Sequence, residues 1–159
     1  MDTGNRDVYL KLENLQPIGS FKLRGATNAM ALADDNVIAN GVSTASAGNM
    51  AQGVAWCARA RGVKCTVIVP DQAPQTKLDA IERLGGTIVK RSFDEWWNVI
   101  VNHGDPEMKG LFIHPFADEA VMAGNGTIGL EILAAPLRYP SLSLHTRQPA
   151  LPPTPPARY

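Results

Sequence analysis

The chain has 159 residues, no formal net charge at pH 7, 45% hydrophobic residues and 19% charged residues. This length and composition are typical of one globular domain or of part of a larger one. The balanced charge argues against nucleic acid or an anionic membrane as a partner. The sequence has no apolar stretch long enough to span a bilayer and no apolar signal-peptide core at its start. We therefore expect no membrane partner and no nucleic-acid partner.

Only two cysteines, Cys57 and Cys65, are present, so the sequence predicts no disulfide framework. A reducing, cytoplasmic setting is the default for such a chain. The cysteines and the scattered His103, His114 and His145 match no zinc-ligand spacing. We expect two buried free thiols and no metal site.

Strand and helix patterns alternate along the chain. Strands are expected at residues 8–12, 42–45, 65–69, 87–89 and 111–113. Helices are expected at about residues 22–32, 51–61, 74–84, 95–103 and 120–133. The β-branched run at 65–69, stopped by Pro70, is typical of a strand buried on both faces. The alternation predicts an α/β fold with a mostly parallel, open sheet and helices on both faces.

Residues 134–159 differ in composition from residues 1–133, which we take as the folded unit. The tail holds seven of the 12 prolines and no Asp or Glu. We expect it to be disordered or polyproline-like, because it cannot extend a helix and offers little periodic apolar surface. Two origins stay open for it: a truncated or frame-shifted gene product, and a genuine linker or ligand of a proline-binding domain.

The segment Gly19–Ala26, which reads Gly-Ser-Phe-Lys-Leu-Arg-Gly-Ala, places a lysine at the expected start of a helix. Ser20 suits the N-cap, because its hydroxyl can accept a backbone N–H of the first turn. Lys22 then lies near the positive end of the helix dipole, which lowers its pKa and favours the neutral, nucleophilic amine. On these residues alone, a solvated surface lysine is the alternative.

The segment Ser46-Ala47-Gly48-Asn49 lies between an expected strand and an expected helix. Backbone N–H groups at a helix N-terminus form a natural anion site, which suits a substrate carboxylate. A capped helix without a ligand is the alternative interpretation.

The segment Gly124–Gly129 matches the dinucleotide fingerprint G-x-G-x-x-G. That fingerprint must follow a strand, open a helix and precede an acidic residue by about 20 positions. Here the preceding residues have helical character and the downstream segment has no acid. We therefore interpret these glycines as positions of close helix packing.

Three segments together resemble the serine/threonine dehydratase family, the pyridoxal-phosphate (PLP) enzymes of the tryptophan-synthase-β fold type. The similarity runs from about residue 7 to residue 133. The segments that carry it are Lys11–Ile18 followed by Gly19–Ala26, then Thr44–Gly53, then His114–Phe116 with Ala123–Glu131. Because these motifs are ordered and spaced as in the family, the resemblance is specific at family level.

The resemblance implies a PLP-dependent ammonia-lyase that converts L-threonine or L-serine to a 2-oxo acid and ammonia. Lys22 would hold the cofactor as a Schiff base and take the α-proton, with Phe21 near the cofactor ring. Asn49 would contact the ring oxygen of the cofactor. The expected substrate-carboxylate pocket consists of Ser46, Ala47, Gly48 and Asn49. The resemblance also implies a small-molecule amino-acid substrate and a homo-oligomer.

Two alternatives remain beside the dehydratase. Serine racemases that resemble this family tend to have a serine where this chain has Ala47, and an alanine cannot move a proton. Ala47 therefore favours elimination over racemisation, although another hydroxy-amino-acid lyase stays open. The sequence also has no glycine-rich run such as GGGGL to cradle the cofactor phosphate. Residues 1–133 thus resemble a small domain with part of a large one, possessing an exposed apolar sheet face, and a non-catalytic fragment is the second alternative.

Overall fold

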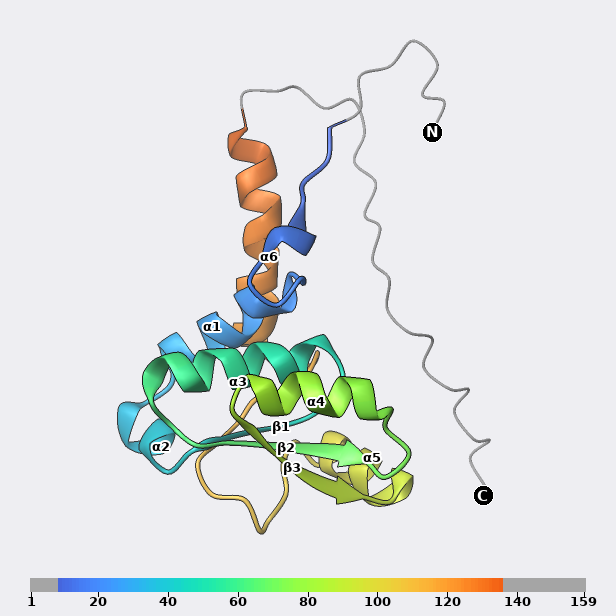
Figure 1. Ribbon diagram of the computed structural model, residues 1–159. Coiled ribbons are helices and arrows are strands. Elements are labelled where there is room, and N and C mark those ends of the chain that lie inside the picture. Colours follow the sequence, from blue (N-terminus) through green and yellow to red (C-terminus); the bar gives the residue numbers. More distant parts are fainter. Residues whose placement is uncertain (1–8, 136–159) are drawn as a thin grey trace, which may run out of the picture.

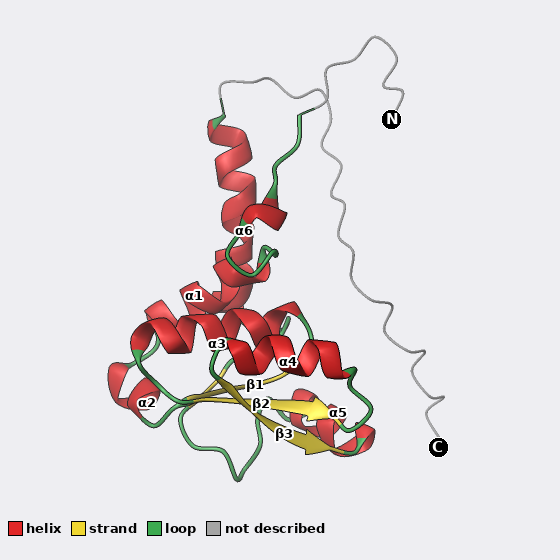
Figure 2. Cartoon of the chain, viewed as in Figure 1, coloured by secondary structure: helices red, strands yellow, loops and turns green. Residues whose placement is uncertain are grey.

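The computed structural model describes residues 9–135, which form a four-stranded sheet with helices on both of its faces (Figure 1). The strands are β1 (Val42–Ala45), β2 (Cys65–Pro70), β3 (Gly86–Arg91) and β4 (Leu111–Phe112). The helices are α1 (Lys22–Leu32), α2 (Asp35–Ala39), α3 (Asn49–Arg61), α4 (Gln75–Arg83), α5 (Phe93–Val101) and α6 (Glu119–Ala134), and a 3-10 turn, η1 (Glu13–Leu15), precedes them. The predicted α/β fold is confirmed (Figure 2).

The strand order is β3-β2-β1-β4, and each pair of neighbours is parallel. Val42 at the start of β1 pairs with Cys65 on one side and with Leu111 on the other. The chain moves outward from β1 to β3 and then crosses to the opposite side of β1 to form β4. The strand order therefore reverses between β1 and β4, and ligands of open parallel sheets bind at such a reversal, outside the carboxyl ends of the strands.

Two hydrophobic cores cover the two faces of the sheet. On the first face, Val67 and Val69 of β2 pack in one buried cluster with Val54 of α3. On the second face, Ile68 packs with Val99 of α5 in a separate buried cluster. Because successive strand residues point to opposite faces, this two-sided cover explains the continuous β-branched sequence of β2.

Small residues let α1 approach its neighbouring helices closely. A Cβ added at Gly124 of α6 would lie 2.5 Å from the backbone oxygen of Arg24, and one added at Gly53 of α3 would lie 3.4 Å from Ala26 Cβ. Gly124–Gly129 lies inside the continuous helix α6 and follows no strand directly. The structure thus confirms close packing at Gly124 and provides no strand-to-helix turn for a dinucleotide.

The predicted strand at residues 8–12 is wrong for its described part. Residues 9–12 form no strand, and the chain turns into η1 at Glu13. Lys11 instead forms ion pairs with Glu13 and with Glu131 of α6. The segment therefore lies beside a helix, where no neighbouring strand offers backbone hydrogen bonds, and the alternation of its apolar residues does not produce a strand.

Helix ends differ from the prediction by a few residues, and one helix was missed. The missed helix is α2, whose N-cap Asp34 accepts a hydrogen bond from the backbone N–H of Asn36 at 2.7 Å. Helix α5 begins at Phe93, after a capping box between Ser92 and Glu95. At α1, Phe21 occupies the N-cap position, and Ser20 Oγ accepts the N–H of Lys22 at 3.3 Å from one residue further upstream.

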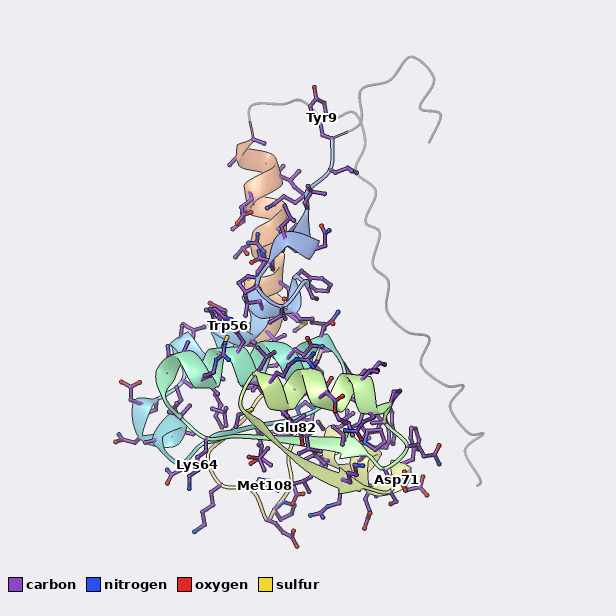
Figure 3. The ribbon with its side chains drawn as sticks, in the orientation of Figure 1. Tyr9, Trp56, Lys64, Asp71, Glu82 and Met108 are labelled. Carbon is purple, nitrogen blue, oxygen red and sulfur yellow. The ribbon has the colours of Figure 1, made fainter. Side chains whose placement is uncertain are left out.

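The predicted exposed apolar face does not lie on the sheet. Buried clusters cover both faces of the sheet. Several of the large exposed apolar side chains lie on the projecting end of α6 and on residues 9–15 beside it (Figure 3). Leu15 is 73% exposed and Leu133 is 83% exposed.

Cys57 and Cys65 are buried free thiols, as expected. Within residues 9–135, no helix is both long and apolar enough to cross a membrane. The predicted tail falls outside the described residues beyond position 135.

Candidate active site

The candidate site lies where the strand order reverses. The loop after β1 begins at Ser46, and the loop after the adjacent strand β4 contains Pro115. Since β1 and β4 are parallel neighbours, both loops leave the same edge of the sheet. The first turn of α1 lies against the second loop, because Lys22 Nζ donates a hydrogen bond to the carbonyl oxygen of Pro115 at 2.8 Å.

Lys22 is the first residue of α1, and its side chain is half-buried. Burial lowers the pKa of its ammonium group from the ordinary value. The predicted direction is therefore the direction found, with burial as its cause. Within residues 9–135, Lys22 forms no ion pair with a carboxylate. Within that part of the chain, no carboxylate therefore stabilises the charged ammonium form of Lys22.

Phe21 lies beside the amine. Lys22 Nζ is 5.5 Å from the centroid of the Phe21 ring, within the range of a cation–π contact. Phe21 is half-buried. Phe21 can therefore shape the apolar side of the site, while its own role toward a cofactor stays a prediction.

The loop after β1 presents backbone donors. Ser46 Oγ accepts the N–H of Gly48 at 3.1 Å, which closes a tight turn before α3. Gly48 occupies the N-cap position and has no side chain to accept the amides of the first turn. Asn49 begins the helix with an exposed side chain. This is the arrangement of helix-terminal N–H groups that suits an anion.

The first turn of α3 faces the first turn of α1. Gly53 packs on α1, where an added Cβ would lie 3.4 Å from the backbone oxygen of Lys22. Asn49 precedes Gly53 by four residues and so lies on the same side of α3. The structure thus brings Lys22, Phe21 and the predicted carboxylate loop to one edge of the sheet. Within that loop, Ala47 is half-buried and packs against the core.

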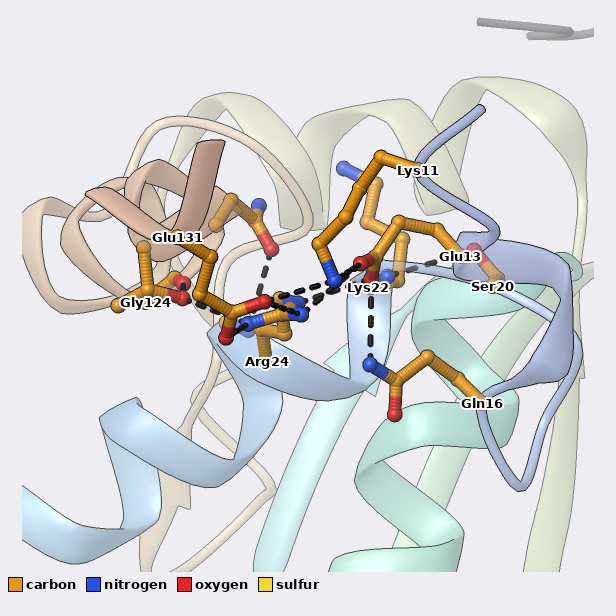
Figure 4. A network of polar contacts seen from close by, with 11 residues as sticks. Lys11, Glu13, Gln16, Ser20, Lys22, Arg24, Gly124 and Glu131 are labelled. Atoms are coloured by element: carbon orange, nitrogen blue, oxygen red, sulfur yellow. Dashed lines mark hydrogen bonds and ion pairs between the residues drawn. The ribbon is translucent and has the colours of Figure 1, made fainter. Parts of the chain in front are cut away.

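An ion network fastens the lysine-bearing helix from its other side (Figure 4). Arg24 donates to both carboxylate oxygens of Glu13, at 2.8 and 2.9 Å, and to both oxygens of Glu131, at 2.6 and 2.9 Å. Lys11 adds a 2.7 Å ion pair to Glu131. The Arg24 guanidinium and then Lys11 lower the pKa of Glu131 to about 2, and Arg24 is also the main cause of the lowered pKa of Glu13. The network joins η1, α1 and α6.

Sequence reasoning missed two features of the site. Pro115 supplies a main-chain carbonyl, and a carbonyl has no sequence signal because each residue has one. The Arg24 network joins residues far apart in the chain, with Arg24 and Glu131 separated by 107 positions, and a charge pattern does not reveal such pairs. The motif Ser-Phe-Lys-Leu-Arg-Gly-Ala contains both the lysine and the arginine, so the sequence shows that the two side chains are near each other. It does not show which distant residues they contact.

The chain is similar to known proteins of one enzyme family. The family model described as "Pyridoxal-phosphate dependent enzyme" matches residues 2–142. The L-threonine ammonia-lyase of Geobacter sulfurreducens is 48% identical over 128 residues, which cover 79% of this chain and 32% of that protein. The biosynthetic L-threonine dehydratase IlvA of Burkholderia multivorans is 49% identical over 130 residues, with 79% and 26% coverage. This chain thus spans about a third or less of the length of these curated relatives.

Two solved structures show similar folds. The processed form of threonine deaminase isoform 2 from Solanum lycopersicum superposes with a TM-score of 0.66 at 39% identity and covers 78% of this chain and 36% of that one. Serine racemase from Dictyostelium discoideum superposes with a TM-score of 0.65 at 40% identity, with 77% and 40% coverage. Both similarities extend over most of the described residues.

Proposed function

Because this chain belongs to the family of pyridoxal-phosphate dependent enzymes, we propose that it carries the lysine-bearing part of a PLP-dependent ammonia-lyase site. The proposed substrates are L-threonine and L-serine, and the products are a 2-oxo acid and ammonia. One observation carries the proposal: Lys22 lies half-buried, without a carboxylate partner in the described part of the chain, at the strand-order reversal of a parallel sheet. The curated relatives that bear threonine ammonia-lyase names support the reaction class.

The residues present suit two of the three groups by which a protein would bind the cofactor, namely its aldehyde and its ring oxygen but not its phosphate. The Lys22 amine, with its lowered pKa, suits the aldehyde, because a neutral lysine is the nucleophile that condenses with a carbonyl. Asn49 suits the ring oxygen, because its exposed amide is free to donate or accept at the mouth of the site. No glycine-rich run of this sequence suits the phosphate. We therefore propose Lys22, Asn49 and Phe21 as the cofactor contacts of this chain.

When bound, the cofactor supplies an electron sink for the charge left at the substrate Cα. Ser46, Ala47, Gly48 and Asn49 would hold the substrate carboxylate, through backbone N–H groups at the start of α3. Held in this way, the substrate would present its Cα–H to Lys22 Nζ, which takes the proton as general base. Phe21 would exclude water from the same side of the amine.

A serine racemase is the second candidate, and the 40% identity with the Dictyostelium discoideum enzyme favours considering it. Racemisation needs a second proton donor on the opposite face of the substrate, whereas elimination needs only one base. Ala47 has no proton to give, so we favour the lyase. Formation of 2-oxo acid without D-serine from L-serine would support elimination, and D-serine without 2-oxo acid would support the racemase.

Three further assignments complete the proposal. We propose that residues 1–133 form the dehydratase-like unit and that residues 134–159 form a separate tail. We propose a homo-oligomer as the assembled form, in line with the family resemblance. A cytoplasmic location agrees with the two free buried thiols.

The experiment that tests the proposal is covalent capture of the cofactor. The purified chain is incubated with PLP and reduced with borohydride, and the modified peptide is mapped by mass spectrometry. We expect the adduct at Lys22, its loss in Lys22→Arg, and no change in the matched control Lys64→Arg, whose side chain is exposed. Labelling spread over exposed lysines, unchanged by Lys22→Arg, would refute the proposed role. The captured chain is then assayed for 2-oxo acid from L-threonine.

A further inference from the structure

The loop between β4 and α6 sets the position of the Lys22 amine. Its Pro115 carbonyl is the 2.8 Å acceptor of Lys22 Nζ, 93 positions away in sequence. A carbonyl can hold an amine in place only if its own loop is held. The groups that fix this loop therefore matter for the geometry of the proposed site.

His114 fixes that loop from inside. Its ring is 3% exposed, and its Nδ1 accepts the backbone N–H groups of Phe116 at 3.2 Å and of Ala117 at 2.8 Å. Since Nδ1 accepts, the neutral ring carries its proton on Nε2, which lies 3.2 Å from the carbonyl oxygen of Ile100 and donates to it. One imidazole thus ties both sides of Pro115 to the end of α5.

Aromatic contacts hold the ring from two sides. Phe116 meets it edge-on at 4.6 Å between centroids, and the His103 ring lies 4.4 Å away at an interplanar angle of 32°. His103 itself has a φ of 54°, in the left-handed region. A third ring, that of Phe112, lies edge-on at 6.3 Å between centroids. The loop is therefore held by three hydrogen bonds and three ring contacts that converge on His114.

We propose that His114 is a positioning residue, which in its neutral form holds the β4–α6 loop so that the Pro115 carbonyl places Lys22 Nζ for reaction with a cofactor aldehyde. The inference deepens the proposed function and rests on it. His114 touches neither substrate nor cofactor in this proposal and acts through Pro115 alone. Protonation would place a hydrogen on Nδ1 and abolish its two acceptor bonds, which would release the loop.

The surrounding charges favour the neutral ring. Burial, and then the neighbouring His103, lower the pKa of His114. The Ile100 carbonyl, on α5, and Asp118, at the start of α6, act in the opposite direction and raise it. Lys22 meets the same loop at the neighbouring carbonyl of Pro115. The loop is therefore expected to stay fixed at neutral pH and to loosen in acid.

The test measures the reactivity of Lys22 without any cofactor. The chain is acetylated with a trace of acetic anhydride, and modification of Lys22 is expressed relative to exposed Lys64 in the same sample. At pH 8 we expect His114→Leu to lower this ratio about tenfold, because the amine then swings into solvent and loses the burial that favours its neutral, reactive form. His114→Asn should restore the ratio to within about twofold, because its amide oxygen can accept where Nδ1 does. Equal ratios in all three proteins would overturn the proposal.

A pH titration of the unaltered chain keeps the test decisive if His114→Leu does not fold. Two ordinary lysines lose reactivity in parallel below pH 7, so their ratio stays constant unless the site changes. We expect the ratio to fall where His114 protonates, as followed by the NMR shifts of its ring protons. His103→Asn is the control, because asparagine tolerates the positive φ at this position. It removes the neighbouring ring that lowers the pKa of His114, so the fall in the ratio and the protonation of His114 should move together to higher pH. A constant ratio, or a fall that does not follow His114, would refute the positioning role. If the acetylation ratio follows His114 as expected but PLP is not captured at Lys22, the result would count against the proposed function and not against the positioning role.

Discussion

Arg24 is the residue whose substitution should most weaken the attachment of η1 and of the end of α6 to α1. The change is Arg24→Met, which keeps the aliphatic stem and removes the guanidinium. In the structure this group forms two forked pairs, one with Glu13 and one with Glu131, and it donates to Thr127 Oγ1 at 3.0 Å. The substitution therefore removes the charged link between α1 and both η1 and α6.

The expected magnitude follows from the exposure of each pair. The side chains of Arg24 and Glu13 are 14% and 16% exposed, whereas that of Glu131 is 48% exposed. Breaking a buried pair costs about 3–5 kcal/mol, and an exposed pair contributes about 0–1 kcal/mol. Since Glu13 keeps Lys11 and Gln16 as partners, we expect Arg24→Met to lower the free energy of unfolding by about 2–3 kcal/mol. Glu131→Gln should lower it by less than Arg24→Met does, because the Glu131 side chain is more exposed.

The assay is urea-induced unfolding at pH 7, followed by tryptophan fluorescence. The matched control is Arg61→Met, because Arg61 makes only a 4.0 Å contact with the 98% exposed carboxylate of Asp35. It should change the free energy of unfolding by less than about 0.5 kcal/mol. If Arg24→Met and Arg61→Met cost the same, the argument from burial is wrong. If Glu131→Gln costs as much as Arg24→Met, the division between the two pairs is wrong.

Two further predictions concern packing and pH. Gly124→Ala should destabilise the chain by about 1–3 kcal/mol, because the added Cβ meets the backbone of α1. Gly126→Ala, with open space around the added Cβ, should stabilise the chain by about 0.5–1 kcal/mol. Equal effects of the two substitutions in urea unfolding would refute the close-packing argument. The contribution of neutral His114 to stability should be complete above its ordinary pKa of 6.5 and should be lost as pH falls toward its lowered value in the folded chain. Urea midpoints measured from pH 8 to pH 5 should therefore fall in this window for the unaltered chain. A midpoint that stays flat there, or that falls equally in His114→Asn, would contradict it.

The sequence predicted the parts of the fold whose patterns are local. The β-branched run at Cys65–Pro70 and the alternation of strands with helices were sufficient for a parallel sheet, because burial on both faces leaves a direct mark on composition. Gly62 directly follows the helix expected at residues 51–61, and it adopts a left-handed φ of 69° at the C-cap of α3, where a glycine is the usual end signal. Such signals need no knowledge of distant partners.

The sequence could not predict features that depend on a partner far away in the chain. Residues 9–12 alternate like a strand, but a strand also needs a neighbour, and Lys11 instead pairs with a helix. The short helix α2 depends on the Asp34 cap and offers too few residues for a periodic pattern. At the site, Lys22 could be singled out from its motif, whereas the Pro115 carbonyl and the His114 ring that fixes it became visible only in three dimensions.

The spacing within the lysine motif has a helical explanation. Lys22 and Arg24 are two residues apart, and two steps of an α-helix rotate a side chain by about 200°. The amine therefore faces the β4–α6 loop while the guanidinium faces η1 and the end of α6. Gly25, which follows Arg24, lets α6 approach closely, since an added Cβ would lie 2.8 Å from the backbone oxygen of Val121. A single turn of α1 thus holds the reactive group and the anchors that fix it, and a shift of one residue between them would turn the amine away from the carboxyl edge of the sheet.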